Sequence, residues 1–530
     1  MSSQQKKLPI GIQSFEKLIN EGAVYVDKTK YIYELLKLGF GAYFLSRPRR
    51  FGKSLLVSTL EAIFKNKREL FKGLWLDSSE YAWKEFPVIK FDMSTVAQKT
   101  DIELIVGLKD AVKDNAKNEQ IVLEESDSPG RMFQSLIHAL VKKYGEKVVV
   151  LIDEYDDPII KHVTRPEMAA RNREVLHDFY KIMKAEDANL RFVFLTGISK
   201  FVKTSIFSGL NNLENISLLA EYSPLLGYTQ DELESYFRGY ILNFAETQSL
   251  TVSAALEEIK LWYNGYRFSE SEIKVYNPFS SLLFFKHKKF TNYWFETGTP
   301  TYLVDLIKKK LPEIKDFEDG IRVLQRSFES YEIESLPIIP LLYDTGYLTI
   351  KSSSTNNMMQ DYILAYPNLE VKNAMLDSLL LGFSETSMEK IDNIIFSISD
   401  AISTSNLEKF FSILKSYFAS IPYDLIPEKK LDEKYFQLIF YLLMRVSSFR
   451  VNTEDRTNLG RIDLVLESDT SVYLFELKVN SSAKAALEQI KEKKYYEKYL
   501  NIHKEVLIIG VNFSLEERNV TDWVVESIGL

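Results

Sequence analysis

Cysteine is absent from this chain of 530 residues. Its absence excludes disulfide bonds, thiolate zinc sites and a cysteine nucleophile, and it agrees with a reducing compartment. A long apolar run is also missing, because the most apolar stretch, residues 435–446, is too short to cross a bilayer and is typical of a buried helix. Residues 1–7 contain no apolar segment of a secretory signal. We therefore expect a cytoplasmic protein without a membrane partner.

Positive charge is not in excess either. The formal net charge is −8, which excludes a uniformly basic nucleic-acid-binding protein, so nucleic acid would have to meet a local patch. The composition is otherwise that of a folded protein, with 45% hydrophobic and 26% charged residues. A chain of this length exceeds one ordinary core, and we expect about two to four domains.

Short runs rich in branched and aromatic residues alternate with helical patterns in the first part of the chain. Four such runs lie at residues 41–45, 88–93, 148–153 and 191–197. Runs of this kind with helices between them are typical of buried parallel strands. We predict an α/β domain with a mostly parallel, doubly wound sheet over residues 1–235.

Two further domains are predicted from the remaining sequence. Residues 236–385 show helical patterns with aromatic-rich segments and are predicted to form a helical, winged-helix-like middle domain. Residues 386–530 are predicted to form a second α/β domain, because strand-like runs flank a Lys/Glu-rich helix there. These elements lie at residues 461–466, 471–479, 484–500 and 505–513.

The tripeptide Gly52-Lys53-Ser54 follows a predicted strand and opens a predicted helix. In that context backbone N–H groups cradle phosphate, Lys53 reaches the β and γ oxygens, and the Ser54 hydroxyl ligates Mg²⁺. The usual G-x-x-x-x-G-K-[ST] pattern has a glycine five residues before Gly52, where this chain has Arg47. The first glycine mainly permits a tight turn, whereas Gly52 lets the backbone approach phosphate closely. We predict a working nucleotide site with an altered entrance.

That entrance is basic. Pro48 pre-sets the loop, and Arg49 and Arg50 add cationic donors. We predict that nucleotide is bound by Arg49, Arg50, Gly52, Lys53, Ser54 and Leu55. The alternative for the tripeptide is a helix start with a solvated lysine. Whether Arg47, Arg49 and Arg50 contact nucleotide, nucleic acid or a neighbouring subunit stays open at this point.

Two later strands complete the predicted nucleotide site. Residues 148–153 run into Asp153 and Glu154. A carboxylate at the end of the neighbouring strand completes the Mg²⁺ shell and the next one polarises the attacking water, so we assign Asp153 to metal and nucleotide binding and Glu154 to catalysis. The alternative is an acidic strand end that faces solvent. A third strand ends near Thr196 and Ser199, and we predict that Thr196 senses the γ-phosphate, with ordinary strand-end polarity as its alternative.

These motifs resemble the bacterial AAA-ATPase-like family of P-loop proteins. The resemblance covers about residues 8–380 and rests on GIQSFEKLINEGAVYVDKTKYI, FLSRPRRFGKSLLVSTLEAIF, VVVLIDEYDDPI and LTGISKF. It implies ATP with Mg²⁺ as ligands, and it implies that residues 25–29 lie near the base or the P-loop. An arginine finger would come from Arg49, Arg50 or Arg267. The segment WYNGYRF, at residues 262–268, is more typical of core packing than of a site.

A second group of chemically active residues lies in the segment GRIDLVLESDTSVYLFELKV. Asp463 and Glu476 are two carboxylates that can bind Mg²⁺ or Mn²⁺, which polarises a phosphodiester, while Lys478 steadies the transition state. Glu476 and Lys478 are two residues apart on a predicted strand and therefore share a face. The alternative is a charged hairpin surface with an ion pair.

The position of Asp463 depends on the hairpin register. With a four-residue loop at residues 467–470, Leu466 pairs with Ser471. Asp463 then becomes a diagonal neighbour of Glu476 on the same face. A shift of one residue would place Asp463 on the opposite face.

This segment resembles the PD-(D/E)xK nuclease superfamily, with Ile462-Asp463 in place of Pro-Asp. The resemblance implies that Asp463 and Glu476 are metal ligands and catalytic residues and that Lys478 and Gln489 are catalytic. Gln489 and Tyr496 lie seven residues apart on the predicted helix, so we expect them to share one face, which is similar to the accessory Gln/Tyr motif of exonuclease-like members. The resemblance also points to Glu433 on an earlier helix. Phosphate contacts, or alternatively a solvated helix face, are expected for Lys484, Lys491, Lys493, Lys494 and Lys498.

Together the motifs predict an ATP-hydrolysing switch joined to a metal-dependent nuclease that acts on DNA or RNA. A role in defence or mobile-element biology is implied by the resemblance alone. The alternative is an ATP-driven signalling or scaffold protein whose carboxy-terminal domain binds nucleic acid or a partner without cutting. Coincidental motifs in a two-domain protein are the remaining interpretation. Either leading hypothesis is compatible with a homo-oligomer.

Overall fold

The chain folds into two compact units, each built from segments that are not continuous in sequence. The first unit comprises Met1–Tyr302 and Asp316–Lys372, and the second comprises Leu303–Lys315 and Asn373–Leu530. The computed structural model describes residues 6–199, 212–294, 301–310, 316–328, 337–356, 359–384, 386–423, 432–447, 450–457, 460–500 and 503–528. The boundaries at residues 235 and 385 stay predictions.

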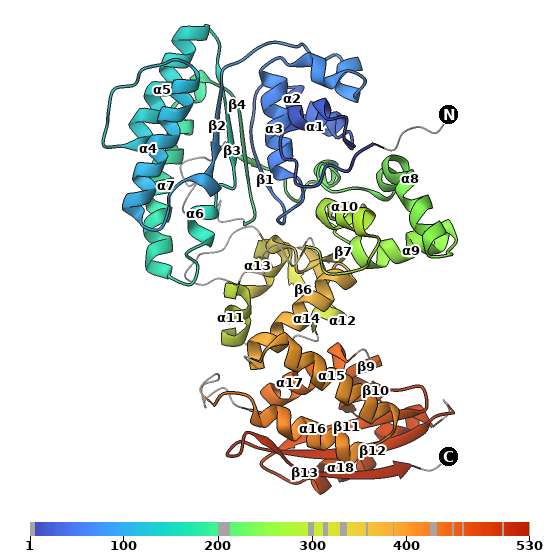
Figure 1. The fold of residues 1–530 in the computed structure, drawn as a ribbon. Helices are drawn as coiled ribbons and strands as arrows, with labels where there is room; N and C mark the ends of the chain where they lie inside the picture. Colours follow the sequence, from blue (N-terminus) through green and yellow to red (C-terminus); the bar gives the residue numbers. More distant parts are fainter. Residues whose placement is uncertain are drawn as a thin grey trace. The chain divides into compact units, whose positions relative to one another are not determined.

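A five-stranded parallel sheet forms the centre of the amino-terminal part of the first unit (Figure 1). Its order is β2-β3-β4-β1-β5, and this confirms the predicted parallel α/β fold. The bounds are β1 (Ala42–Ser46), β2 (Val88–Asp92), β3 (Val148–Asp153), β4 (Leu190–Gly197) and β5 (Glu214–Asn215).

Strand β4 lies between β1 and β3. Phe44 pairs with Leu195 on one side of β4, and Ile152 pairs with Leu195 on the other. The sequence interpretation made β3 the direct neighbour of β1, and that part of it is wrong, because chain order does not set spatial order in a doubly wound sheet. The loop after β1 therefore has to pass the end of β4 to meet the carboxylates after β3.

Helices cover both faces of this sheet. One face is covered by α4 (Asp101–Asn118), α5 (Pro129–Tyr144) and α7 (Pro166–Ala185), and the other by α1 (Phe15–Asn20) and α3 (Lys53–Phe64) (Figure 1). Short polar side chains begin these helices: Thr100 caps α4, and Ser128 caps α5 ahead of its first-turn proline. Strand β3 is buried along its whole length, as a strand covered on two faces should be.

The rest of the first unit is helical with one small antiparallel sheet. Its aromatic core confirms the packing expected for residues 262–268, since Tyr263 and Tyr266 are fully buried. The sheet has the order β6-β8-β7. The bounds are α2 (Thr29–Leu36), α6 (Asp157–Ile160), α8 (Gln230–Thr247), α9 (Val252–Tyr263), α10 (Pro278–His287), α12 (Asp316–Asp319), β6 (Ile321–Leu324), α13 (Ile338–Thr345), β7 (Thr349–Asn356) and β8 (Met359–Ala365).

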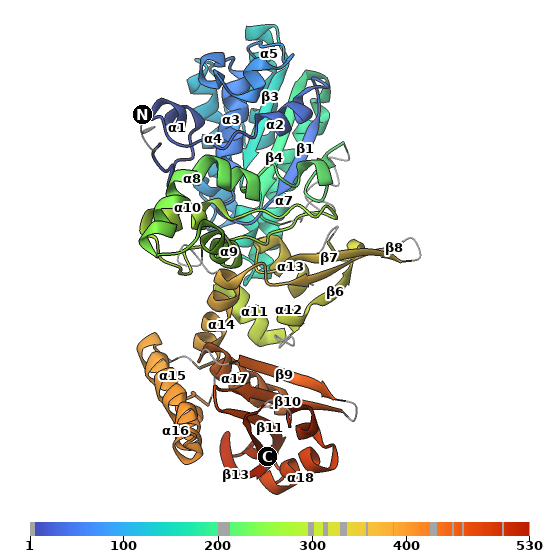
Figure 2. The same ribbon diagram turned by 90° about the vertical axis from the view of Figure 1, so that its right-hand side faces the viewer.

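The second unit contains a mixed five-stranded sheet of order β13-β12-β11-β10-β9. Helices α16 and α17 pack on one face through aromatic pairs such as Phe440–Phe475, and α18 with η11 packs on the other (Figure 2). The bounds are α11 (Thr301–Lys310), α14 (Leu369–Ser384), α15 (Met388–Ser403), α16 (Leu407–Ala419), α17 (Glu433–Val446), β9 (Arg450–Thr457), β10 (Gly460–Glu467), β11 (Ser471–Val479), α18 (Ala483–Glu492), η11 (Tyr495–Tyr499), β12 (Glu505–Ser514) and β13 (Asn519–Ile528). Within the described part of the chain, every helix is too short or too polar to cross a membrane.

Candidate functional site

The loop after β1 places the start of α3 against a cavity of about 360 Å³. Two residues of this loop have left-handed backbone angles, since Arg50 has φ 66° and the N-cap Gly52 has φ 94°. Such left-handed angles are routine for glycine and uncommon for other residues. Every P-loop residue of the predicted nucleotide set lines the cavity: Arg49, Arg50, Gly52, Lys53, Ser54 and Leu55.

Arg47 does not reach this cavity but is buried behind the loop. It is 2% exposed, and its guanidinium lies 4.2 Å from the ring centroid of Phe268. It donates hydrogen bonds to the carbonyls of Ser46 and Ser217, both at 2.8 Å, and to that of Tyr222 at 3.2 Å. Burial lowers the pKa of Arg47 to about 10. Arg47 therefore ties the loop to the segment that follows β5.

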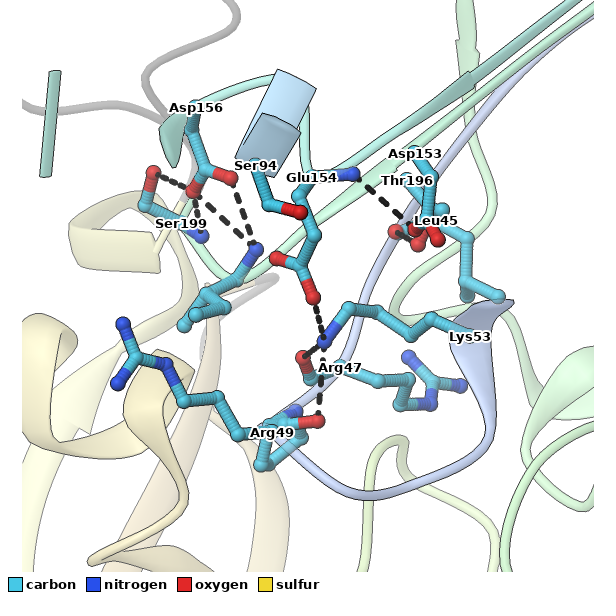
Figure 3. Close-up of polar contacts among 12 residues, drawn as sticks. Leu45, Arg47, Arg49, Lys53, Ser94, Asp153, Glu154, Asp156, Thr196 and Ser199 are labelled. Atoms are coloured by element: carbon cyan, nitrogen blue, oxygen red, sulfur yellow. Dashed lines mark hydrogen bonds and ion pairs between the residues drawn. The ribbon is translucent and has the colours of Figure 1, made fainter. Parts of the chain in front are cut away.

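The side chains of Lys53 and Glu154, which both line the cavity, point toward each other (Figure 3). The Lys53 Nζ lies 3.4 Å from Glu154 Oε1 and donates to the carbonyls of Arg47 and Pro48, each at 3.2 Å. Glu154 has φ 50°, so the chain turns sharply as it leaves β3 and directs this carboxylate toward the P-loop. A lysine and a carboxylate that line one cavity are the residue types that phosphate binding and polarisation of a water require.

Asp153 lies beside Ser54 at the end of β3. The two residues line a second cavity of about 270 Å³, and Ser54 also lines the first one. Burial, reinforced by the charge of Glu154, raises the pKa of Asp153 to about 6, while a hydrogen bond from Ser54 opposes the rise. A carboxylate beside a hydroxyl is the oxygen pair that Mg²⁺ takes in P-loop proteins.

The hydroxyl groups of Thr196 and Ser199 both hydrogen-bond to other groups of the protein. Thr196 is fully buried and donates from Oγ1 to the Leu45 carbonyl at 2.9 Å, so it joins β4 to β1 and does not line the cavity. The Ser199 hydroxyl and its backbone N–H both donate to Asp156 Oδ2 at 2.6 Å. The structure does not bring the predicted γ-phosphate sensor to the cavity.

The sequence reasoning missed Asp156 and Asp92. Asp156 is fully buried and also accepts from the Ile198 N–H, and burial together with Glu154 raises its pKa to about 7. Asp92 ends β2 beside Asp153 and lines both cavities. The rule that carboxylates at parallel strand ends gather at one edge would have found Asp92.

The amino-terminal segment at residues 9–13 was also missed as part of the site. Pro9, Gly11, Ile12 and Gln13 line the large cavity together with the P-loop residues. A smaller cavity of about 80 Å³ shares Pro9, Gly52 and Leu55 with it and is lined mostly by apolar side chains. Segments this far from the P-loop in sequence give no local signal of a shared cavity.

Residues 25–29 were expected near the base or the loop. Tyr25, Val26 and Lys28 line the smaller cavity. Lys28 donates to both oxygens of Glu232 at 2.7 and 2.6 Å and to the Pro224 carbonyl at 2.8 Å. The segment therefore holds the wall of that cavity to α8.

The Arg267 guanidinium is buried and hydrogen-bonded within the first unit. It is 1% exposed and donates to the carbonyls of Ser271 at 2.7 Å, Glu270 at 2.6 Å and Lys351 at 3.2 Å. A guanidinium bonded in this way fixes the loop after Phe268 to β7. It is not presented to a nucleotide.

The hairpin β10–β11 has a different register from the predicted one. Leu466 pairs with Tyr473 and Glu467 with Val472, so the four residues between the paired strands are 468–471. The predicted pairing of Leu466 with Ser471 is wrong, because Ser468 and Ser471 hydrogen-bond each other in the turn. The change moves the pairing by two residues, and an even shift keeps every side chain on its face.

Continuing this register sets Asp463 directly opposite Glu476 and not diagonal to it. Asp463 Oδ2 accepts from the Leu477 N–H at 2.8 Å, and Lys478 Nζ lies 3.4 Å from Glu476 Oε1. Glu476 is 2% exposed, and its Oε2 has no hydrogen-bond partner. Burial, reinforced by Asp463, raises the pKa of Glu476 to about 8.

Gln489 of α18 donates to Glu476 Oε1. This contact depends on Gly510 of β12, which pairs with Glu476, because a Cβ at Gly510 would lie 2.0 Å from the Ala483 carbonyl oxygen. The missing side chain lets α18 lie close against the sheet.

Tyr496 does not share a helix with Gln489. Helix α18 ends at Glu492, Lys494 has φ 50°, and Tyr496 belongs to the following 3-10 turn, η11. The expectation that Gln489 and Tyr496 share one face of a single helix is therefore wrong. Glu433 is exposed at the start of α17 and accepts a hydrogen bond from Gln437 at 3.2 Å.

The lysines of the carboxy-terminal helix are partly paired. Lys491 lies 2.6 Å from Glu526, and Lys494 lies 3.4 Å from Glu497. Lys498 lies over the Tyr499 ring. Their phosphate contacts stay a prediction.

A divalent ion at the carboxy-terminal site fits two observations. Glu476 presents an unpaired buried oxygen, and Asp463 places a second carboxylate opposite it. Among the described residues, no group of three or more His, Cys, Asp or Glu side chains gathers as a metal site.

Two protein families match separate parts of the chain. Residues 9–207 match the family of predicted AAA-ATPases, and residues 431–523 match the PD-(D/E)XK nuclease superfamily. A curated relative from Azotobacter chroococcum mcd 1, described as "Uncharacterized protein in vnfD 5'region", is 37% identical over 536 residues, which is 99% of this chain and 100% of the relative. The chain belongs to this AAA-ATPase-like family. Its carboxy-terminal part is a PD-(D/E)XK superfamily domain.

One solved structure resembles this AAA-ATPase-like protein only distantly. The ORC2 protein of Aeropyrum pernix, in ADPNP–ADP complexes, is 12% identical with a TM-score of 0.29, over 71% of this chain and 94% of that one. A likeness of this size supports no argument about the present site.

Proposed function

We propose that this AAA-ATPase-like protein binds and hydrolyses ATP and that its nucleotide state controls a metal-dependent nuclease in the PD-(D/E)XK domain. The observation that carries the first part is the placement of Lys53, Ser54 and Glu154 around one cavity at the start of α3. Matches to both families support the pairing of the two activities in one chain.

In the ATPase step, Lys53 and the N-terminus of α3 would hold the phosphates. Ser54 and Asp153 would hold Mg²⁺, which neutralises charge on the phosphate oxygens when bound. Glu154 would orient the attacking water and accept its proton. The cavity is lined by polar and charged groups at the phosphate end, and the adjoining apolar cavity suits the base.

In the nuclease step, Asp463 and Glu476 would hold the Mg²⁺ or Mn²⁺ ion, which activates water and polarises the phosphodiester when bound. Gln489 donates to one oxygen of Glu476, and the other oxygen has no hydrogen-bond partner and would be available to the ion. Lys478 supplies positive charge beside the same carboxylate. A role in defence or mobile-element biology rests on the family resemblance alone.

The alternative function is an ATP-driven scaffold that binds nucleic acid or a partner without cutting. The pairing of Lys491 and Lys494 with carboxylates favours it, because these lysines are then less available to phosphates. Both functions allow a homo-oligomer and a cytoplasmic location.

The test is digestion of labelled DNA and RNA by the full chain with ATP and either Mg²⁺ or Mn²⁺. Wild type is compared with Lys53→Ala and Lys478→Ala. We expect Lys478→Ala to lose cutting and Lys53→Ala to lose the effect of ATP on cutting. A wild-type chain that hydrolyses ATP but cuts neither substrate with either metal would leave only the scaffold function.

A further inference from the structure

The loop at residues 47–51 carries three arginines, and its contacts separate their roles. The Arg47 guanidinium is buried and bonded to three carbonyls. The Arg50 guanidinium is centred 5.0 Å from the Phe279 ring. Among the described residues, the Arg49 guanidinium makes no hydrogen bond, ion pair or ring contact, although it lines the cavity with Lys53 and Glu154.

The backbone that carries Arg49 is fixed on both sides. Its carbonyl accepts a hydrogen bond from the Trp294 indole at 3.2 Å. Pro48 packs so closely on Gly346 that a Cβ there would lie 2.7 Å from the Pro48 Cβ. Phe51 is buried against the rings of Tyr266 and Phe268, at 4.8 and 5.4 Å. A fixed backbone with one unbonded side chain presents that side chain at little entropic cost.

Two of the acidic side chains that line the cavity have cationic partners among the described residues. Glu154 is paired with Lys53, and Asp157 with Lys161 at 2.6 Å. Figure 3 shows the side chains of Arg47 and Arg49 leaving the loop in opposite directions, Arg47 behind the loop and Arg49 on the side of Glu154 and Asp156. A half-buried, unpaired guanidinium beside Lys53 calls for an anion that the protein itself does not supply.

We propose that Arg49 is a catalytic residue that contacts the γ-phosphoryl group of ATP from within the same chain. This inference rests on the proposed ATPase function and specifies the arginine that acts in it. Water attacks the γ-phosphorus, the bond to the β,γ-bridging oxygen breaks, and ADP leaves with the electron pair. The proton of the water passes to Glu154, and the products are ADP and inorganic phosphate. Arg49 keeps its proton and donates to the oxygens on which negative charge grows.

An arginine in this role has a characteristic kinetic signature. Because its contact strengthens in the transition state, its loss lowers kcat more than it raises KM. We expect Arg49→Ala to lower kcat about 10³-fold or more, the range for an arginine that stabilises phosphoryl transfer. KM for ATP should rise by less than about tenfold. Arg49→Lys keeps the charge but not the planar fork and should lie between wild type and Arg49→Ala.

The experiment measures steady-state ATPase of the full chain with Mg²⁺ for wild type, Arg49→Ala, Arg49→Lys and Arg50→Ala, with Lys53→Ala as the phosphate-binding control. The fold decrease in kcat caused by Arg50→Ala should be less than a tenth of the fold decrease caused by Arg49→Ala. Thermal melting with and without ATP shows whether each variant folds and binds. The exposed Arg238→Ala on α8 should match wild type.

A mixing experiment separates action within one chain from action between copies. Arg49→Ala is mixed with Lys53→Ala at equal concentration, and we expect no recovery of ATPase. Recovery, or an Arg49→Ala variant with wild-type kcat, would overturn the assignment while leaving the ATPase function in place. A wild-type chain without ATPase would instead remove the proposed function, and this inference with it.

Discussion

At the scale of single residues, two buried carboxyl groups with raised pKa values differ in their surroundings. Asp156 and Glu476 are both buried, and each lies near a second carboxylate that raises its pKa further. Asp156 has its oxygens filled by donors from the end of β4, whereas Glu476 keeps one oxygen without a partner. The first arrangement holds a backbone turn, and the second suits a cation.

Asp156 should make the stability of the first unit depend on pH. The pKa of Asp156 is raised from its ordinary value of 3.8 to about 7 in the folded state. Between these two pH values the folded state therefore binds more protons than the unfolded state. The free energy of unfolding contributed by this group is therefore fully present below pH 3.8 and falls as pH rises toward 7. We expect Asp156→Asn to reduce the drop in melting temperature between pH 5 and pH 7.5. The exposed Asp114→Asn serves as control, and an equal slope in all three proteins would contradict the prediction.

The effect of Glu476→Gln on the melting temperature should change sign when a divalent metal is added. In EDTA at pH 8 the variant should melt at a higher temperature than wild type, because it removes a carboxylate whose buried charge costs free energy as pH rises from 4.5 toward 8. With Mn²⁺, wild type should gain melting temperature and the variant should not. Nuclease activity should fall at least about 100-fold, since a neutral amide replaces a metal ligand. Glu488→Gln, exposed on α18, is the matched control.

At the scale of elements, the loop after β1 shows how a departure from a motif is accommodated. Arg47 occupies the place of the first glycine, but its backbone does not have a positive φ, so the freedom of glycine is not needed there. The side chain instead supplies three donors to carbonyls around the end of β1. The loop is thereby joined to the segment after β5.

Arg47→Gly would restore the usual motif and yet should damage the protein. Three carbonyls lose their donor and the Phe268 ring loses its partner. We expect the free energy of unfolding to fall by about 2–4 kcal/mol. Urea unfolding of the full chain, followed by tryptophan fluorescence, measures this. A variant as stable as wild type would show that the carbonyls are satisfied by water.

At the scale of the whole molecule, the chain enters the second unit twice. Leu303–Lys315 belongs to the second unit, although the following segment, Asp316–Lys372, returns to the first. Within the second unit α11 packs on α14, because a Cβ at Gly382 would lie 2.4 Å from Val304 Cγ1. Leu303 and Ile307 are almost fully buried there. A carboxy-terminal fragment cut at residue 386 would lack this helix.

Ile307→Ala should therefore destabilise the second unit, although Ile307 precedes residues 316–372, which belong to the first unit. Removing a fully buried isoleucine costs about 2–5 kcal/mol. Hydrogen exchange should show the loss of protection in α14, with the sheet β1–β4 unchanged. Loss of protection confined to the first unit would contradict this placement. The exposed Leu242→Ala, on α8 of the first unit, is the control.

The sequence by itself determined what depends on local pattern and residue chemistry. Apolar runs placed the strands, the Gly52-Lys53-Ser54 tripeptide placed the start of α3, and the spacing of Glu476 and Lys478 placed them on one face. Tertiary structure decided what depends on contacts between distant segments. These include the position of β4 between β1 and β3, the burial of Arg47, the use of Thr196 within the sheet, and the break between Gln489 and Tyr496. Such contacts are set by which surfaces meet when the chain packs, and no local period in the sequence records that choice.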